Sequence, residues 1–379
     1  MILKASELSQ HASTTKKLGR VLHIINGEHY SGAERVQDLL ARQLPEMGFD
    51  VGFLCLKSGL FEANRQSRSA PITTVEMKSK FDNRPAKRVI ELVRSEGYTI
   101  LHAHTPRSLM VGASAVATLK MPLVYHVHSP VGRDSKRWMA NKVNTLVENY
   151  FLRRVSKMIC VSSSLKKYML SLGHADDRLV VVPNGVPVVS TPPIKKPQDD
   201  FVLGMVALFR PRKGTEVLLE ALAILRKRNI RVRLLAVGPF ETKEYQQQIH
   251  SLAAQLGVAG QIEWTGFTKD VTAQLQRMHA MVLPSLFGEG LPMVVLEAMA
   301  SGLPVIASQV EGIPEAIRDG VDGLLFEAAN PAQLADQILA MKSDLNRWEQ
   351  MGTSARERHR ECLSDVAMAT KIAAVYQSL

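Results

Sequence analysis

Two glutamates occupy a glycine-rich loop and the apolar segment that follows it, within residues 284–305. Glu289 lies between two glycines of the loop, and Glu297 lies in the apolar segment, which has Pro292 near its start. Because proline is favoured in the first turn of a helix, this segment predicts a helix, and apolar residues on nearly every side predict that it is buried. A buried carboxylate requires a polar partner, which is either a nearby Lys or Arg or a ligand with hydroxyls, such as a ribose.

The glycines beside Glu289 point to the same ligand site. Gly288 and Gly290 have no side chains, so their backbone amides allow a ligand to approach closely. Glu289 stands next to the predicted helix start, where a carboxylate can instead serve as a cap or as a partner of the helix dipole. The residue types therefore favour a ligand site, with a purely structural role of the carboxylates as the alternative.

Two pairs of histidines form a second candidate site. His102 and His104, and likewise His126 and His128, stand two residues apart at the ends of predicted strands. Alternate residues of a strand face the same side, so each pair could bind a metal with His23 or Asp134 as a further ligand. The alternative, which we favour, is that one histidine contacts substrate while the others stabilise loop ends. We therefore predict no metal site.

The elements that must position these residues repeat a simple pattern. Short apolar runs alternate with amphipathic stretches from Arg20 onward, which predicts parallel sheets covered by helices on both faces. The rhythm breaks at residues 183–200, where five prolines indicate a linker. We predict one Rossmann-like domain over residues 1–188, with 1–18 flexible, and a second over 200–360. Residues 361–379 are expected to form a helix that packs back on the first domain.

Two doubly wound domains in series are expected to place the carboxyl ends of both sheets on either side of a cleft. Ligands bind at such ends, where helix N-termini and loops converge. The formal charge of +11 is concentrated in the N-terminal half, which suggests an anionic partner or a solvated basic face. A nicotinamide dehydrogenase is disfavoured, since only Gly27 and Gly32 follow the first strand and the second strand ends at Lys57.

The order of several short motifs resembles glycosyltransferase family 4, whose members are retaining enzymes of the GT-B fold. The two glutamates are followed by Ala-Met-Ala and Gly-x-Pro-Val, and this signature is the most specific part of the resemblance. The supporting segments are Ser31-Gly32-Ala33-Glu34-Arg35, His126-Val127-His128, Cys160-Val161-Ser162, Val182-Pro183-Asn184-Gly185-Val186, Arg212-Lys213-Gly214 and Gly312-Ile313-Pro314-Glu315. The resemblance covers nearly all of the chain after residue 20.

The resemblance implies a role for each matching residue. Glu297 would bind the ribose hydroxyls of a nucleoside-diphosphate sugar, and Glu289 would bind hydroxyls of the transferred sugar. Lys213 would neutralise the diphosphate, and His128 would lie close to the donor sugar. The backbone at Gly290, Leu291 and Pro292 would lie near the sugar and phosphate, and Gly32 would let the first loop approach the diphosphate. His128, Glu289 and Lys213 are thus the implied catalytic residues.

Two positions depart from the family pattern. The family often has Gly-Arg-Leu shortly before Lys-Gly, and its arginine binds the diphosphate, whereas this chain has Ala207-Leu208-Phe209. Arg210 or Arg212 is the candidate replacement. Many relatives have glycine where this chain has Glu311.

The resulting prediction is a retaining glycosyltransferase that moves a sugar to an acceptor hydroxyl in cell-surface polysaccharide or glycolipid synthesis. It would need no metal or other cofactor. The acceptor would be a carbohydrate or a lipid-linked molecule. A metal-dependent hydrolase using the histidine pairs and a nucleic-acid-binding protein using the basic half are the alternatives, although the basic residues lack the aromatic platform of single-strand binders.

The expected location is the cytoplasm. The chain has three cysteines, an odd number, so a disulfide framework is not expected. Basic and apolar residues are mixed at 133–142 and at 151–154, which suggests peripheral contact with an anionic membrane on its inner face. The alternative is an ordinary helix that packs Trp138 and Phe151 into the core.

Overall fold

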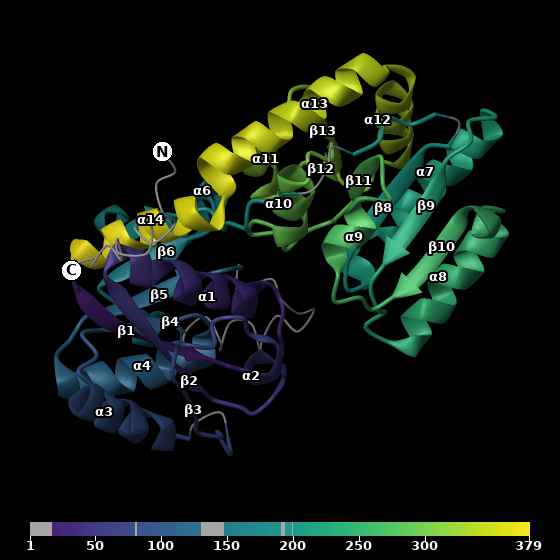
Figure 1. The fold of residues 1–379 in the computed structure, drawn as a ribbon. Helices are drawn as coiled ribbons and strands as arrows, with labels where there is room; N and C mark the ends of the chain where they lie inside the picture. Colours follow the sequence, from purple (N-terminus) through teal and green to yellow (C-terminus); the bar gives the residue numbers. More distant parts are fainter. Residues whose placement is uncertain (1–16, 80–81, 130–147, 191–193, 199) are drawn as a thin grey trace, which may run out of the picture.

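A computed structural model describes residues 17–79, 82–129, 148–190, 194–198 and 200–379. These residues form two parallel sheets, each covered by helices, and a pair of C-terminal helices that runs from one sheet to the other (Figure 1). The prediction of two doubly wound Rossmann-like domains is confirmed. The basic stretch at 133–142, with Trp138 and the candidate ligand Asp134, lies outside the described residues.

The N-terminal domain contains a sheet of order β3-β2-β1-β4-β5-β6-β7, in which all pairs of neighbouring strands are parallel. Its strands are β1 (Gly19–Ile25), β2 (Phe49–Cys55), β3 (Ile72–Thr74), β4 (Ile100–Ala103), β5 (Leu123–Val127), β6 (Lys157–Cys160) and β7 (Leu179–Val181). Its described helices are α1 (Gly32–Gln43), α2 (Leu60–Asn64), α3 (Arg84–Glu96), α4 (Pro106–Leu119) and α6 (Ser163–Ser171).

The C-terminal domain contains a sheet of order β10-β9-β8-β11-β12-β13, also parallel. Its strands are β8 (Val202–Val206), β9 (Arg233–Val237), β10 (Ile262–Gly266), β11 (Ala280–Leu283), β12 (Val305–Ser308) and β13 (Gly323–Phe326). Its helices are α7 (Thr215–Lys227), α8 (Lys243–Gln255), α9 (Val271–Leu275), α10 (Met293–Ala300), α11 (Ile313–Ala316) and α12 (Pro331–Ser343).

In each sheet the strand order reverses once, between β1 and β4 and between β8 and β11. Loops on the two sides of such a reversal diverge and leave a crevice at the carboxyl ends of the strands, where ligands bind. The loops after β8 and β11 carry Lys213 and Glu289, and His104 directly follows β4. The reversals therefore place the predicted site residues at the two positions that favour a ligand.

The C-terminal helices connect the domains. Helix α13 (Leu345–Arg358) continues through a π-helical turn, His359–Leu363, into α14 (Asp365–Gln377), which lies against the N-terminal domain (Figure 1). Gln43 at the end of α1 donates a hydrogen bond of 2.8 Å to Asp365. The ring of Tyr376 packs edge-on against Phe49 at 5.3 Å. The last helix therefore contributes side chains to the interior of the N-terminal domain.

Candidate functional site

The loop that follows β11 is held against the loop that follows β8. Gly214 has a φ of +67°, and a Cβ there would lie 2.0 Å from the carbonyl oxygen of Pro284. Only glycine allows this backbone conformation together with so close an approach. The amide of Leu286 also donates to the carbonyl of Arg212 at 2.8 Å. The two loops therefore present their side chains to one point.

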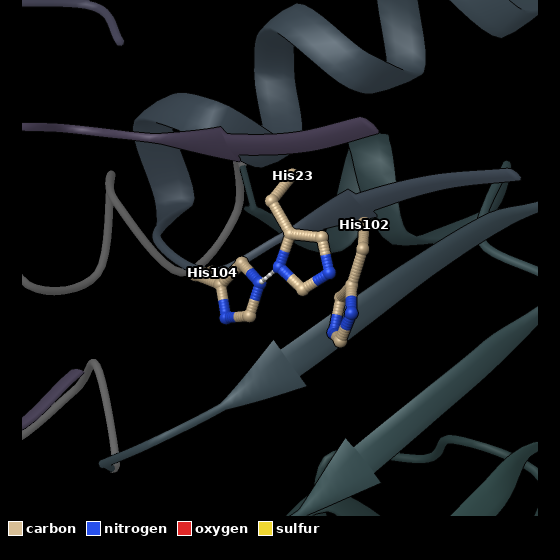
Figure 2. A group of neighbouring side chains, drawn as sticks. All are labelled: His23, His102 and His104. Atoms are coloured by element: carbon tan, nitrogen blue, oxygen red, sulfur yellow. Dashed lines mark hydrogen bonds between the residues drawn. The ribbon is translucent and has the colours of Figure 1, made fainter. Parts of the chain in front are cut away.

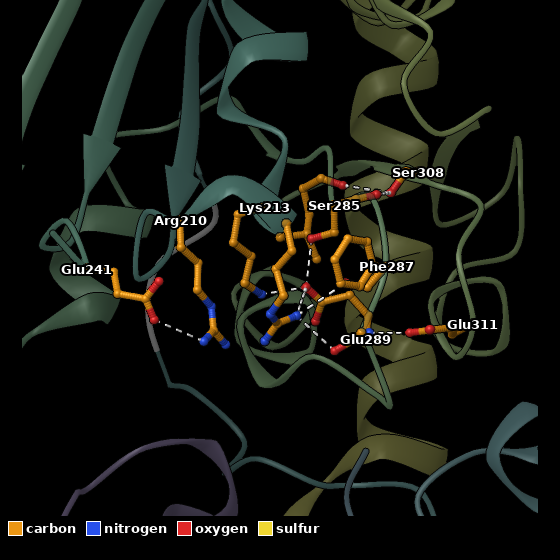
Figure 3. Close-up of polar contacts among 11 residues, drawn as sticks. Arg210, Lys213, Glu241, Ser285, Phe287, Glu289, Ser308 and Glu311 are labelled. Atoms are coloured by element: carbon orange, nitrogen blue, oxygen red, sulfur yellow. Dashed lines mark hydrogen bonds and ion pairs between the residues drawn. The ribbon is translucent and has the colours of Figure 1, made fainter. Parts of the chain in front are cut away.

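That point is a buried carboxylate surrounded by donors (Figure 3). Glu289 accepts hydrogen bonds from the ammonium of Lys213 and, at 2.7 Å, from the hydroxyl of Ser285. The guanidinium Nη1 of Arg212 lies 3.6 Å from the same carboxylate oxygen and donates to the carbonyl of Gly288 at 2.9 Å. Burial lowers the pKa of Lys213, and the adjacent carboxylate opposes that shift. We call Lys213, Arg212, Ser285 and Glu289 the charged centre.

Glu311 orients the backbone of the charged centre. Its carboxylate accepts a hydrogen bond from the amide of Glu289, and the amide of Gly312 donates to the carbonyl of Glu289 at 3.0 Å. Glu311 has a φ of +46°, in the left-handed region that favours glycine. This backbone conformation explains why a glycine suits position 311. The glutamate in this chain adds the hydrogen bond that its carboxylate accepts from the amide of Glu289.

Arg210 stands apart from the charged centre. Its guanidinium points to Glu241, with 3.4 Å between Nη1 and Oε1 (Figure 3). Arg210 and Arg212 are the two candidates to replace the diphosphate-binding arginine that the family pattern has and this chain lacks. Arg212 lies against Glu289. Arg210 lies nearer the pocket that Glu241 helps to line. That pocket has a volume of about 540 Å³. Its lining includes the aromatic side chains of Phe240 and Trp264.

Glu297 lies in the middle of α10, as the sequence predicts, and its side chain is 13% exposed. One of its oxygens pairs with the guanidinium of Arg35, which projects from α1 of the other domain. Its second oxygen, Oε2, is buried and has no hydrogen-bond partner among the described residues. The basic partner considered from the sequence is therefore present, and one carboxylate oxygen remains for a further donor.

The two domains come together at the residues after Glu289. A Cβ at Gly290 would lie 2.1 Å from the carbonyl oxygen of His128, so only glycine fits there. The side chain of Asn184 donates to the carbonyl of Leu291 at 3.0 Å. Pro292 is the N-cap of α10, and a Cβ at Gly32 would lie 3.9 Å from the sulfur of Met293. Residues 290–293 therefore lie against the N-terminal half of the chain.

The predicted histidine pairs form one buried cluster with His23. Strands β1, β4 and β5 are neighbours, and His23 stands in register with His102. His104 lies 3.0 Å from His23 and 3.3 Å from His128, measured between ring nitrogens. Figure 2 shows the hydrogen bond between His23 and His104. The ring of His126 stacks on that of His128 at 4.3 Å.

Burial keeps this cluster uncharged. It lowers the pKa of His23 to about 3 and that of His128 to about 4, and it lowers the pKa values of His102, His104 and His126 well below the usual range. One ring nitrogen from each of His23, His102 and His104 lies within 4.8 Å of the others, and the same holds for His104, His126 and His128. Neutral imidazoles at this spacing are able to bind a metal such as zinc.

Sequence reasoning assigned no role to three residues of the site. Arg35 belongs to the motif that contains Gly32, but its spacing does not reveal a partner 262 positions away. Ser285 precedes the loop glycines, and a serine is too common to stand out. Tyr376 reaches the histidine cluster from α14, with its hydroxyl 2.6 Å from His102 Nδ1. A motif of fixed order could have indicated Arg35, whereas no local pattern indicates Tyr376.

None of the helices in the described part of the chain is both long and apolar enough to cross a membrane.

The chain is 24% identical over 349 residues to an Escherichia coli UDP-Gal:alpha-D-GlcNAc-diphosphoundecaprenol alpha-1,3-galactosyltransferase, covering 88% of this chain and 90% of that protein. It is 27% identical to a phosphatidyl-myo-inositol mannosyltransferase of Mycobacterium leprae, covering 74% of each chain.

Solved structures and family models agree with these similarities. The fold matches that of Anabaena HepE in complex with UDP with a TM-score of 0.83, at 21% identity, covering 95% of this chain and 100% of that one. Residues 30–189 match the model described as Glycosyltransferase Family 4, and residues 190–358 match the model described as Glycosyl transferases group 1. The chain is therefore a glycosyltransferase with the GT-B fold and belongs to the group 1 family.

Proposed function

We propose that this enzyme transfers a sugar from a nucleoside-diphosphate sugar to an acceptor hydroxyl with retention of the anomeric configuration. The reaction would serve the synthesis of cell-surface polysaccharide or glycolipid. The observation that carries the proposal is the charged centre, in which Lys213 and Arg212 meet Glu289 just before the N-terminus of α10. The relatives whose names specify a UDP-galactose donor and lipid-linked or inositol-lipid acceptors support the same class of substrates.

The charged centre suits a diphosphate leaving group. Breaking the bond between sugar and diphosphate leaves positive charge on the sugar and increases negative charge on the phosphate oxygens. Fixed cations aimed at those oxygens lower the barrier, and a helix N-terminus adds backbone amides and a partial positive charge. Lys213 would supply a point charge and Arg212 a planar fork. In the absence of donor, Glu289 is the counter-ion that stabilises these partly buried cations.

The remaining residues would bind the two ends of the donor. Glu297 has one buried oxygen without a partner among the described residues, and a ribose hydroxyl could donate to it. Glu289 would accept hydrogen bonds from hydroxyls of the transferred sugar, near the backbone of Gly290 and Leu291. The pocket of about 540 Å³ beside Arg210 would receive the base, with the aromatic ring of Trp264 in its lining.

His128 would bind the sugar from the N-terminal domain, and Gly32 would let the loop before α1 approach the diphosphate. We propose that no metal takes part, because Lys213 and Arg212 could neutralise the leaving group. The departing phosphate would accept the proton of the acceptor hydroxyl on the same face of the sugar. We further propose a cytoplasmic enzyme that does not bind nucleic acid.

A thermal-shift screen against UDP-, GDP- and ADP-sugars tests the donor class. A ligand that binds only the folded state stabilises it by mass action, so the correct donor should raise the melting temperature most. The Lys213→Ala variant, screened in parallel, should lose that rise. A screen in which no nucleotide sugar stabilises the protein would overturn the proposal.

The excess of basic residues in the N-terminal half supports peripheral contact with an anionic membrane. Within residues 151–154, Leu152 is buried and Phe151 packs partly against the core. Arg153 and Arg154 are exposed. Sedimentation with vesicles that contain anionic lipid should show binding at low salt and its loss at high salt, because exposed charges are screened. Failure to bind at low salt would leave only a solvated basic face or a soluble acceptor.

A further inference from the structure

A line of hydrogen-bonding groups runs through the N-terminal domain from the last helix to His128. The hydroxyl of Tyr376 lies 2.6 Å from Nδ1 of His102 and 3.4 Å from Nε2 of His23. Nδ1 of His23 lies 3.0 Å from Nε2 of His104, and Nδ1 of His104 lies 3.3 Å from Nε2 of His128. We call the sequence His102, Tyr376, His23, His104 and His128 the histidine relay.

The direction of donation must be the same along the whole relay. A neutral imidazole has one N–H donor and one nitrogen acceptor, and a phenol can donate one proton while accepting another. Each of the three central members uses both of its groups within the relay. If a bond between two histidines reverses, two lone pairs or two N–H groups face each other. The Tyr376 oxygen could accept from both of its neighbours, but its buried O–H would then have no acceptor among the groups it contacts. Fixing either end therefore fixes the tautomer of every histidine in the relay.

The buried end of the relay sets that direction. Nε2 of His102 is buried and has no hydrogen-bond partner among the described residues. A buried N–H without an acceptor is rarer in proteins than an acceptor without a donor. His126, with no partner at either ring nitrogen among the described residues, already buries one such N–H, and His102 adds no second one when its Nε2 is the lone-pair nitrogen. His102 then donates from Nδ1 to Tyr376, Tyr376 donates to His23, His23 to His104, and His104 to His128.

We propose that Tyr376 and His104 are positioning residues that hold His128 in the tautomer protonated at Nδ1. Nε2 of His128 accepts the bond from His104, which leaves an N–H, and not a lone pair, as the group that His128 can offer to a ligand. His128 is the one relay member that is not fully buried, so it is the member that a ligand can reach. That the ligand is the donor sugar rests on the proposed function.

The relay gives His128 a defined chemical role. A neutral N–H donor can bind a hydroxyl or ring oxygen of a sugar, but it cannot accept the proton of the acceptor hydroxyl. The C-terminal helix, which lies far from His128 in sequence, becomes part of the same device through Tyr376. Its hydroxyl is the junction between His102 and His23, so removing it disconnects the end that sets the direction.

Nuclear magnetic resonance of protein labelled with ¹⁵N in histidine tests the relay without any substrate. Long-range proton–nitrogen spectra distinguish a protonated ring nitrogen from a bare one, and the His128→Gln variant identifies the signals of His128. We expect the wild-type protein to show Nδ1 of His128 protonated and Nε2 bare. His104→Leu should shift the His128 Nε2 signal and populate the other tautomer, and Tyr376→Phe should do so more weakly.

His126→Leu is the matched control. His126 is equally buried and stacks on His128, but neither of its ring nitrogens has a hydrogen-bond partner among the described residues. Its loss should therefore leave the His128 signals in the wild-type tautomer. His104→Asn is a second test, because an asparagine amide can still donate toward Nε2 of His128 and should partly restore the wild-type pattern.

Turnover separates the relay from the proposed function. If His128 binds the sugar, His104→Leu should lower kcat by up to about tenfold, the net value of one hydrogen bond between neutral groups. His104→Asn should recover part of that loss, and His126→Leu should leave kcat unchanged. A tautomer change without a change in kcat would support the relay and remove His128 from the reaction. The inference is overturned if His128 is protonated at Nε2, if His104→Leu leaves its signals unchanged, or if the purified protein holds stoichiometric zinc bound by these nitrogens.

Discussion

The two domains bring polar groups together at the ends of their central strands by opposite physical means. The charged centre of the C-terminal domain pairs the partly buried Lys213 and Arg212 with the buried Glu289, so that the charges compensate each other. The histidine cluster of the N-terminal domain contains five imidazoles that burial keeps neutral. The same sheet geometry therefore supports a site that stabilises charge and a site whose groups only donate and accept hydrogen bonds.

The two domains should therefore differ in how strongly substitutions at these groups change function and stability. Removing one partner of a buried ion pair leaves an uncompensated charge, which is costly, whereas removing one neutral imidazole loses a hydrogen bond of smaller net value. Changes in the charged centre should therefore have large effects on both function and stability. Changes in the histidine cluster should have smaller effects, and these should depend on pH.

Lys213→Ala should have the largest effect. Loss of one group that stabilises transition-state charge lowers kcat by about 10²–10³-fold, and Glu289 loses its closest cation. Turnover with the donor found in the thermal-shift screen measures the first effect, and thermal unfolding measures the second. Arg210→Ala is the control, because Arg210 points to Glu241 and should cost less. Equal losses in the two variants would contradict the assignment of Lys213 to the centre.

Glu297→Gln should weaken donor binding without unfolding the protein. A hydrogen bond to a charged group contributes about 1.5–3 kcal/mol, which corresponds to a dissociation constant about 10–150-fold higher. Titration calorimetry with the donor nucleotide measures the change. Asp322→Asn is the matched control, since Asp322 is buried and ion-paired with Arg318 in the same domain but lies outside the site. Unchanged donor affinity in folded Glu297→Gln would remove Glu297 from the site.

The stability of the N-terminal domain should fall as the pH falls below about 6.5. The folded-state pKa of His23 is about 3 and that of His128 about 4, so between these values and 6.5 only the unfolded chain binds the protons. Each such histidine lowers the unfolding free energy by about 1.4 kcal/mol per pH unit in that range, and contributes no pH dependence above it. Urea unfolding at pH 7.5, 6 and 5 measures the slope.

His23→Leu provides the control for that slope. Because the substitution removes one buried imidazole, the dependence of the unfolding free energy on pH should decrease by about one proton. A wild-type protein whose stability is the same at pH 7.5 and pH 5 would show that the cluster is protonated in the folded state, and the contrast between the two domains would then disappear.

The sequence predicts the elements and motifs of this fold better than the contacts between them. Apolar periodicity predicts both sheets, and the glycine-rich loop with its two glutamates predicts where Glu289 and Glu297 lie. The Arg35–Glu297 pair and the Tyr376–His102 contact join residues more than 250 positions apart. Such pairs follow from the way the domains and the last helix pack, which no local pattern encodes. The direction of the His102 and His126 side chains toward one cluster follows from strand alternation, but their neutrality follows only from burial.

The smallest effect should come from removing divalent metal ions. A diphosphate leaving group requires compensation of its charge, and Lys213 with Arg212 could provide it without a metal. The histidine triads are the candidate ligands that the described residues offer, since their ring nitrogens lie within 4.8 Å of one another. If they held a catalytic zinc, a strong chelator would abolish turnover and added zinc would restore it. We expect chelation to leave turnover unchanged, while His128→Ala lowers it through loss of a sugar contact. Metal analysis of the purified protein completes the test, because stoichiometric zinc together with chelator-sensitive turnover would make the neutral cluster, and not the charged centre, the place where the reaction depends on charge.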